Sequence, residues 1–170
     1  MPENRAYLSL GSNIDPEHNL PAAVRLLGEA GRVLAVSGAW QSAAVGRTDQ
    51  PDFVNAAALL ATPLDAAGLK AGPLAHIEAQ LGRVRGEDKN AARTIDLDIE
   101  LFNEAIFDLG GRHIPSPEIY ERSFVALPLA EIAPDYIHPE TGETLRRIAE
   151  RLTPAARLRP RPDIVLEEKI

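Results

Sequence analysis

The hydrophobic and polar positions along the chain follow two periods, one typical of strands and one typical of helices. Segment 5–10 alternates and stops at Gly11-Ser12-Asn13, so it predicts a first strand. The Val-rich segment 32–40 and the apolar run 53–60 predict two more strands, and 94–102 gives the clearest strand pattern. The pattern therefore places strands early, in the middle and late in the chain.

Apolar residues spaced for one face of a helix fill the segments between these strands. A helix is expected to start at Asp15-Pro16, carry Leu20, Val24 and Leu27 on one face, and end near Gly31. Segment 65–81 predicts a second helix, which Gly72-Pro73 should break or kink in its early part. Segment 123–132 predicts a third helix, despite an internal proline.

The resulting order, β-α-β-β-α-β, is that of a ferredoxin-like α+β fold. We expect an antiparallel sheet with helices packed on one face. The 170 residues show no internal repeat and suit a single domain over residues 1–170. The Arg- and Pro-rich tail, 154–170, is expected to be extended and peripheral.

Composition narrows the classes of function. Hydrophobic residues make up 45% of the chain, which is enough for a core, and the net charge of −7 argues against broad nucleic-acid binding. The absence of cysteine excludes disulfides, thiolate metal sites and thiol nucleophiles. We find no secretory signal and no apolar run near the ~20 residues of a membrane helix, so we expect a cytoplasmic protein.

The strand 94–102 carries the first candidate chemistry. Because side chains alternate across a strand, its two faces differ: Ile95, Leu97, Ile99 and Leu101 share one, and Thr94, Asp96, Asp98 and Glu100 the other. Asp96 and Asp98 would lie ~6–7 Å apart, which suits two carboxylates that bind a pair of Mg²⁺ ions with phosphates. Glu100 is expected to be a solvated strand end rather than a third ligand. The alternative is an acidic face without a ligand.

Basic residues gather just before that strand, and they suit phosphate because guanidinium groups bind it in a bidentate manner. The group consists of Arg83, Arg85, Lys89 and Arg93. The alternative is a solvated loop that pairs internally through Glu87 and Asp88. No Walker-A or G-x-G-x-x-G pattern occurs, so a nucleotide would be held by side chains and metal ions.

Five segments in sequence order resemble one family, the 6-hydroxymethyl-7,8-dihydropterin pyrophosphokinases, over about residues 5–147. The segments are Tyr7–Asn13, Asp49–Asn55, Ile77–Arg83, Arg93–Ile99 (R-T-I-D-L-D-I) and Arg122–Pro134. The resemblance implies a ferredoxin-like fold and the transfer of pyrophosphate from ATP to a pterin alcohol in folate synthesis, with release of AMP. It also implies two Mg²⁺ ions as cofactors, and ATP and the pterin as small-molecule partners.

The resemblance assigns roles by position. Pterin binding falls to Ser42, Val45, Phe53, Asn55 and Phe124. ATP binding falls to Arg83, Arg85, Arg93, Ser116 and Arg122. Metal binding falls to Asp96 and Asp98, and catalysis to these two aspartates with Arg83 and Arg93.

Two positions depart from the family pattern. Asn90-Ala91-Ala92 stands where W-G-P is common, and Ser116 stands where a histidine that contacts ATP is common. Nearby His113 points the other way on an extended chain. Two alternatives therefore remain: a non-catalytic ferredoxin-like module that binds pterin or nucleotide, and a nucleotidyltransferase built on Gly11-Ser12 and the D-x-D strand.

Overall fold

The computed structural model describes residues 3–42, 50–83, 92–153 and 157–166, and its centre is an antiparallel sheet. The sheet runs in the order β5-β1-β4-β3-β8, and β2 also pairs with β4. Its strands are β1 (Asn4–Ser12), β2 (Arg32–Val36), β3 (Trp40–Ser42), β4 (Phe53–Thr62), β5 (Asp96–Phe102) and β8 (Arg159–Pro160). A separate hairpin joins β6 (Phe107–Leu109) to β7 (Arg112–Ile114).

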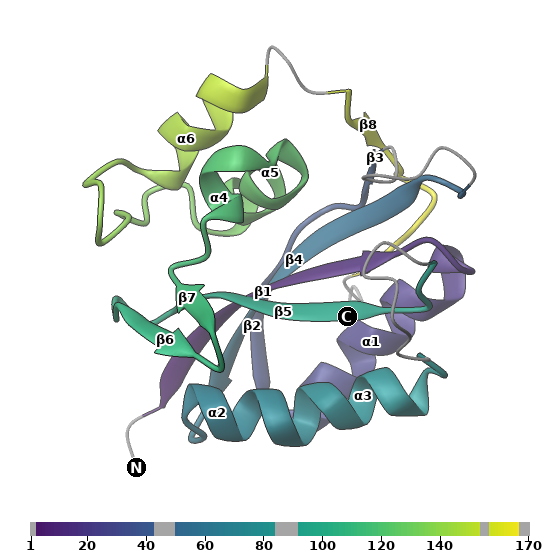
Figure 1. Ribbon diagram of the computed structural model, residues 1–170. Coiled ribbons are helices and arrows are strands. Elements are labelled where there is room, and N and C mark those ends of the chain that lie inside the picture. The colour runs from purple at the N-terminus through teal and green to yellow at the C-terminus, as the bar shows by residue number, and fades with distance from the viewer. Residues whose placement is uncertain (1–2, 43–49, 84–91, 154–156, 167–170) are drawn as a thin grey trace.

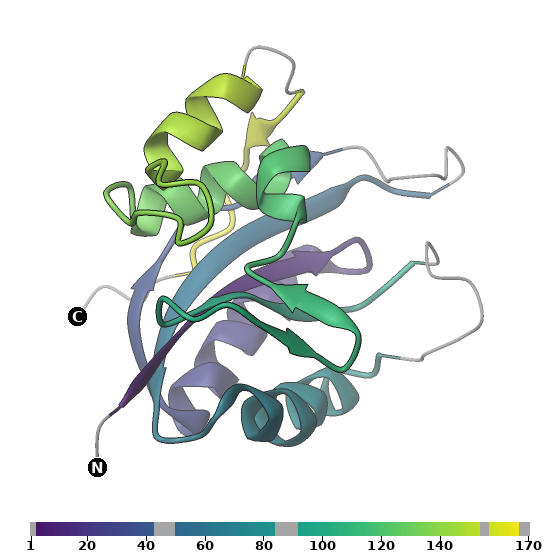
Figure 2. The same ribbon diagram turned by 60° about the vertical axis from the view of Figure 1, so that its left-hand side comes forward.

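Helices cover both faces of this sheet, as Figures 1 and 2 show. One layer holds α1 (Pro16–Ala30), α2 (Ala66–Leu69), the π-helical η1 (Lys70–Leu74) and α3 (Ala75–Gln80). The other layer holds α4 (Glu118–Glu121), α5 (Ser123–Ile132) and α6 (Leu145–Leu152). The predicted ferredoxin-like α+β class is confirmed, but the expectation that helices lie on one face is wrong, because the segment after β7 folds back over the second face.

Two apolar clusters fill the spaces between the layers. The larger cluster lies under α1 and α3 and contains Leu8, Leu20, Leu60 and Ile99, all at most 1% exposed. The smaller cluster lies under α5 and α6 and contains Leu129, which is 0% exposed. Helix α5 supplies a buried face despite Pro128, because Pro128 itself packs among the buried residues. Both faces of β1 and β4 are therefore buried over much of their length.

A β-bulge interrupts the expected alternation of β5. Leu8 pairs with Ile99 and Tyr7 pairs with Leu101, so Glu100 is the extra residue opposite β1. Leu101 consequently packs in the smaller cluster, on the opposite side from Ile99. The prediction that Leu101 shares a face with Ile95, Leu97 and Ile99 is wrong for this reason.

Several boundaries differ from the predicted ones. The expected strand 32–40 is divided into β2 and β3, and the expected break at Gly72-Pro73 is absorbed by the π-helical turn η1, which keeps the helical segment continuous. Helix α6 was not predicted. The C-terminal segment 157–166 is partly extended as expected, yet it pairs with β3 and places Ile164 and Leu166 in the larger cluster.

Within the described part of the chain, no helix is both long enough and apolar enough to cross a membrane.

Candidate active site

The candidate site lies on one row of residues across three neighbouring strands. Gly11 of β1 is paired with Asp96 of β5 on one side and with Asn55 of β4 on the other. Paired residues of antiparallel strands point to the same face, so all three face the same side of the sheet. A Cβ on Gly11 would come within 3.4 Å of Oδ1 of Asn55, and glycine therefore keeps the middle of this row open.

A cavity of about 470 Å³ opens above this row. Its sides carry Phe53 from β4, Phe124 from α5, and Arg122 from the turn before α5. Lys70 of the π-helical turn and Glu118 of α4 complete the lining. The cavity is thus formed by the sheet and by elements of both helical layers.

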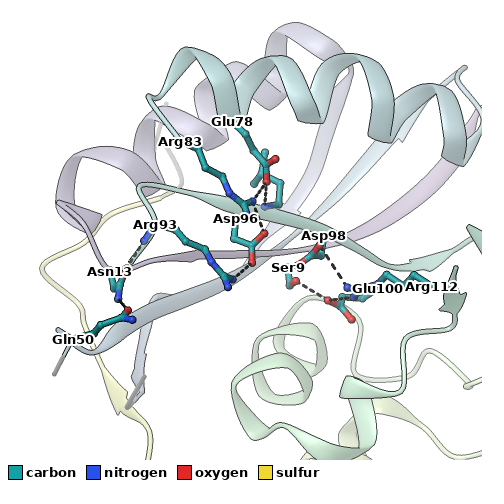
Figure 3. A network of polar contacts seen from close by, with 11 residues as sticks. Ser9, Asn13, Gln50, Glu78, Arg83, Arg93, Asp96, Asp98, Glu100 and Arg112 are labelled. Atoms are coloured by element: carbon teal, nitrogen blue, oxygen red, sulfur yellow. Dashed lines mark hydrogen bonds and ion pairs between the residues drawn. The ribbon is translucent and has the colours of Figure 1, made fainter. Parts of the chain in front are cut away.

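Two arginines neutralise Asp96. Nη1 of Arg83 donates to Oδ1 at 2.8 Å, and Nη1 of Arg93 donates to Oδ2 at 2.8 Å (Figure 3). Glu78 of α3 accepts from the same nitrogen of Arg83 at 2.5 Å and is itself buried. The guanidinium of Arg93 also lies 5.9 Å from the ring centre of Phe53. Both predicted catalytic arginines therefore touch the predicted metal-binding strand.

Asp98 has a different environment. Nη1 of Arg112 lies 3.6 Å from its Oδ1, and Ser9 is its partner across the strand pair (Figure 3). Burial raises the pKa of Asp98 to about 6, and the nearby charge of Asp96 adds to this effect. Asp96 and Asp98 face the same side, and Arg112 neutralises Asp98 only in part. A bound cation would therefore stabilise the ionised form of Asp98.

The two aspartates fit a magnesium site. Their side chains are 21% and 24% exposed, and both line the cavity. Among the described residues, no group of three or more His, Cys, Asp or Glu could hold a metal ion. Two carboxylates with remaining positions for phosphate oxygens and water are the usual protein contribution to Mg²⁺ sites at phosphate substrates.

An oriented amide lies on the other half of the cavity floor. Asn55 is 7% exposed, and its Nδ2 donates to Oγ of Ser42 at 2.8 Å and to the carbonyl of Trp40 at 3.4 Å. These bonds fix which end of the amide carries the oxygen. Ser42, Asn55, Phe53 and Phe124 all line the cavity, as predicted for one pocket.

Asn13 connects the ends of two segments beside the cavity. Its Nδ2 donates to Oε1 of Gln50 at 2.9 Å and to the carbonyl of Pro51, and its Oδ1 accepts from the backbone N–H of Arg93 at 2.7 Å (Figure 3). The side chain is 3% exposed. Asn13 therefore fixes the positions at which residues 50 and 93 enter the site. The sequence interpretation gave Asn13 only the role of ending a strand.

The structure brings most predicted site residues together, with one correction. Ser116 is 1% exposed and does not line the cavity; its Oγ accepts from Arg112 at 3.1 Å, behind the cavity. The nearby His113 is also outside the lining and contacts Asp108 and Glu140. Val45, Arg85 and Lys89 lie outside the described residues.

Three charged residues of the lining were missed, namely Lys70, Arg112 and Glu118. The prediction that Glu100 is a solvated strand end is wrong, because its side chain is 0% exposed. Oε1 of Glu100 accepts a hydrogen bond from Nη2 of Arg112, in the hairpin, at 3.0 Å. In the sequence, the burial of Glu100 was indicated only by its place as a charged residue in an apolar strand, next to the D-x-D pair.

Known proteins resemble this chain in sequence and in fold. It is 42% identical over 154 residues to a 2-amino-4-hydroxy-6-hydroxymethyldihydropteridine pyrophosphokinase of Methylorubrum extorquens, covering 89% of this chain and 95% of the relative. It is 41% identical over 140 residues to the Pseudomonas aeruginosa protein of that name, covering 80% and 85%.

Solved structures agree on the fold. A structure described as HPPK-DHPS in complex with substrates superposes with a TM-score of 0.70 at 14% identity, over 91% of this chain and 44% of that chain. Wild-type HPPK-DHPS of Plasmodium falciparum gives a TM-score of 0.70 over 88% and 43%. This chain thus spans less than half the length of both.

Residues 7–134 match the sequence pattern of one family from β1 to the end of α5, which includes every described residue on the cavity floor. The chain therefore belongs to the family of 7,8-dihydro-6-hydroxymethylpterin-pyrophosphokinases (HPPK).

Proposed function

We propose that this protein transfers pyrophosphate from ATP to the hydroxymethyl group of 6-hydroxymethyl-7,8-dihydropterin, with release of AMP, as a step of folate synthesis. One observation carries the proposal: the carboxylates of Asp96 and Asp98 and the oriented amide of Asn55 face a single cavity. A phosphate-bearing group and a polar ring can therefore bind side by side on one sheet face.

The pterin is assigned to the half of the cavity that contains Asn55. A pterin edge presents both donors and acceptors, and an amide matches both. Phe53 and Phe124 offer aromatic faces from a strand and a helix, and a flat heterocycle can stack between such faces. Ser42 acts by orienting Asn55. Val45 stays a predicted contact.

The phosphates of ATP are assigned to the half that contains Asp96 and Asp98. Arg83, Arg93 and Arg122 all line this cavity and supply positive charge for a triphosphate. Arg83 and Arg93 pair with Asp96, and a bound metal–triphosphate complex would offer the metal to Asp96 and phosphate oxygens to the two arginines. Arg85 stays a predicted contact, and Ser116 is assigned an indirect role through Arg112.

Two Mg²⁺ ions would be held by Asp96 and Asp98. When bound, they would neutralise phosphate charge and lower the pKa of the pterin hydroxyl. The chain's own residues orient the two substrates: Asn55 fixes the pterin, and the arginines fix the phosphates. The pterin hydroxyl releases its proton to solvent as its oxygen forms a bond to the β-phosphorus, the bond from that phosphorus to the α-phosphate oxygen breaks, and AMP leaves with that oxygen. Positioning and charge neutralisation supply most of the acceleration.

Product analysis tests this function. Purified protein with MgATP and 6-hydroxymethyl-7,8-dihydropterin should release AMP only when the pterin is present, and a chelator should abolish the release. Release of inorganic pyrophosphate instead of AMP would identify a nucleotidyltransferase. Saturable pterin binding without AMP would identify a non-catalytic binding module, and either result would overturn the proposal.

A further inference from the structure

A buried ion pair lies directly beneath the Asp98 end of the cavity. The Glu100 side chain is 0% exposed, and its Oε1 accepts hydrogen bonds from Nη2 of Arg112 at 3.0 Å and from Oγ of Ser9 at 2.7 Å (Figure 3). Its Oε2 and the Nε of Arg112 are buried without a partner. Burying the pair therefore costs desolvation free energy, and its hydrogen bonds leave two polar atoms unpaired.

Apolar side chains would fill this place at a lower cost. Replacing a buried ion pair by apolar residues of similar volume is often neutral or stabilising. The pair lies where β5, β1 and the hairpin strand β7 meet, beside apolar residues of both clusters. The pair is therefore a weak source of stability, and its position beside the cavity points to a role there.

Arg112 is the member of the pair that reaches the cavity. Nη2 is held by Glu100 and by Ser116, whereas Nη1 lies 3.6 Å from Asp98, too far for a strong hydrogen bond. The side chain is 28% exposed and lines the cavity. Nη1 is therefore presented to the space beside Asp98, while Nη2 is anchored.

The distribution of charge along β5 supports a ligand at this place. Asp96 forms ion pairs with Arg83 and Arg93, and at the other end of the aspartate pair Asp98 has Arg112 within 4 Å. A triphosphate that spans both aspartates would meet arginines at each end. Guanidinium groups bind phosphate oxygens through directed N–H donors.

We propose that Arg112 is a further phosphate-binding residue at the Asp98 end of the cavity, and that Glu100 is the buried positioning residue that holds it there. The inference rests on the proposed function for the identity of the ligand, MgATP. Glu100 acts only through Arg112, because a fully buried carboxylate touches no ligand.

Paired apolar substitutions separate this role from a structural one. The variants are Arg112→Met, Glu100→Met and the double variant Glu100→Met/Arg112→Met. Arg112→Met should lower the urea midpoint, because it leaves a buried carboxylate unpaired, and the double variant should restore that midpoint. Arg146→Met serves as the matched control, since Arg146 is 56% exposed and pairs with an exposed aspartate.

Binding of MgATP, measured by isothermal titration calorimetry, decides between the two roles. The double variant should bind MgATP roughly tenfold to a hundredfold more weakly than wild type, while its affinity for the dihydropterin stays unchanged. A double variant that regains both stability and wild-type MgATP affinity would overturn the proposal, because the pair would then be structural.

A measurement on the wild-type protein does not depend on the folding of any variant. The Nε–H signal of Arg112 in a ¹⁵N spectrum, assigned with Arg112→Lys, should shift as MgATP is added and stay in place when the dihydropterin is added alone. No shift at saturating MgATP would contradict the proposal. These readouts need no turnover, so they remain distinct from a failure of the AMP assay.

Discussion

The backbone N–H of Leu97 donates to Oε2 of Glu78 at 2.9 Å. Leu97 stands between the two aspartates, so this bond attaches the centre of the candidate metal site to helix α3. The same oxygen of Glu78 accepts from Arg83, which in turn donates to Asp96. The buried carboxylate of Glu78 thus positions both strand β5 and Arg83.

Glu78→Leu removes that acceptor and leaves the buried N–H of Leu97 without it. We expect the free energy of unfolding, measured by urea denaturation, to fall by about 1–3 kcal/mol. The turnover number should change by a larger factor than the KM for either substrate, because the strand that carries the two aspartates loses its hydrogen bond to helix α3. Glu78→Gln keeps an oxygen acceptor and should lose much less stability. Equal stability of the Leu variant and wild type would show that the bond does not position β5.

Asn55→Ala should weaken binding of the dihydropterin. The variant loses the amide on the cavity floor, and we expect the dissociation constant to rise roughly tenfold or more, as for loss of a directed hydrogen bond in a buried site. Fluorescence titration without ATP measures this directly. Asn4→Ala is the control, because Asn4 bonds to the carbonyl of Leu64 outside the cavity. An unchanged constant in Asn55→Ala would place the pterin elsewhere.

Arg161 attaches the C-terminal segment to β3, the strand that brings Ser42 to the cavity. Its Nη1 donates to Oε1 of Gln41 at 3.0 Å, next to Ser42, and its Nη2 donates to Glu17 at 3.0 Å. Arg161→Ala should lower the free energy of unfolding by about 0.2–1 kcal/mol per lost pair and weaken pterin binding a few-fold. Arg146→Ala should leave pterin binding unchanged. Identical pterin affinity in both variants would limit Arg161 to stability.

Glu100 should make stability depend on pH in a defined direction. Burial raises its pKa from 4.5 to about 7, so the folded protein binds this proton more tightly than the unfolded chain. Proton binding by Glu100 therefore stabilises the folded protein, and this stabilisation is fully present below pH 4.5 and is lost as the pH rises through about 7. Glu100→Gln lacks this titration.

The unfolding free energy of wild type minus that of Glu100→Gln should therefore decrease from about pH 5 to about pH 8. Urea denaturation with a chelator present measures the difference and excludes metal binding. A difference that stays constant over this range would show that Glu100 is ionised throughout.

The sequence predicted the parts of the site that depend on local pattern. Asp96 and Asp98 share a face because they are two residues apart on a strand, and the structure confirms that both face the cavity. Helix 123–132 was predicted with the bounds that α5 has. Such features need only the period of the chain and local residue preferences.

The parts that were missed depend on contacts between distant segments. The bulge at Glu100 arises from pairing with β1, and Arg112 reaches the cavity because the hairpin of β6 and β7 folds beside β5. Nothing local indicates that residue 100 pairs with residue 112. The turn η1 likewise keeps Pro73 inside a continuous helical segment, where local rules predict a break.

The most direct test of the central claim compares the two aspartates in one assay. AMP and the pyrophosphorylated pterin are quantified together for wild type, Asp96→Asn and Asp98→Asn, each checked for folding by circular dichroism. We predict equal amounts of the two products from wild type and a loss of at least about a hundredfold in turnover from each variant, because each loses a charged metal ligand. Near-normal turnover in both variants would contradict the account.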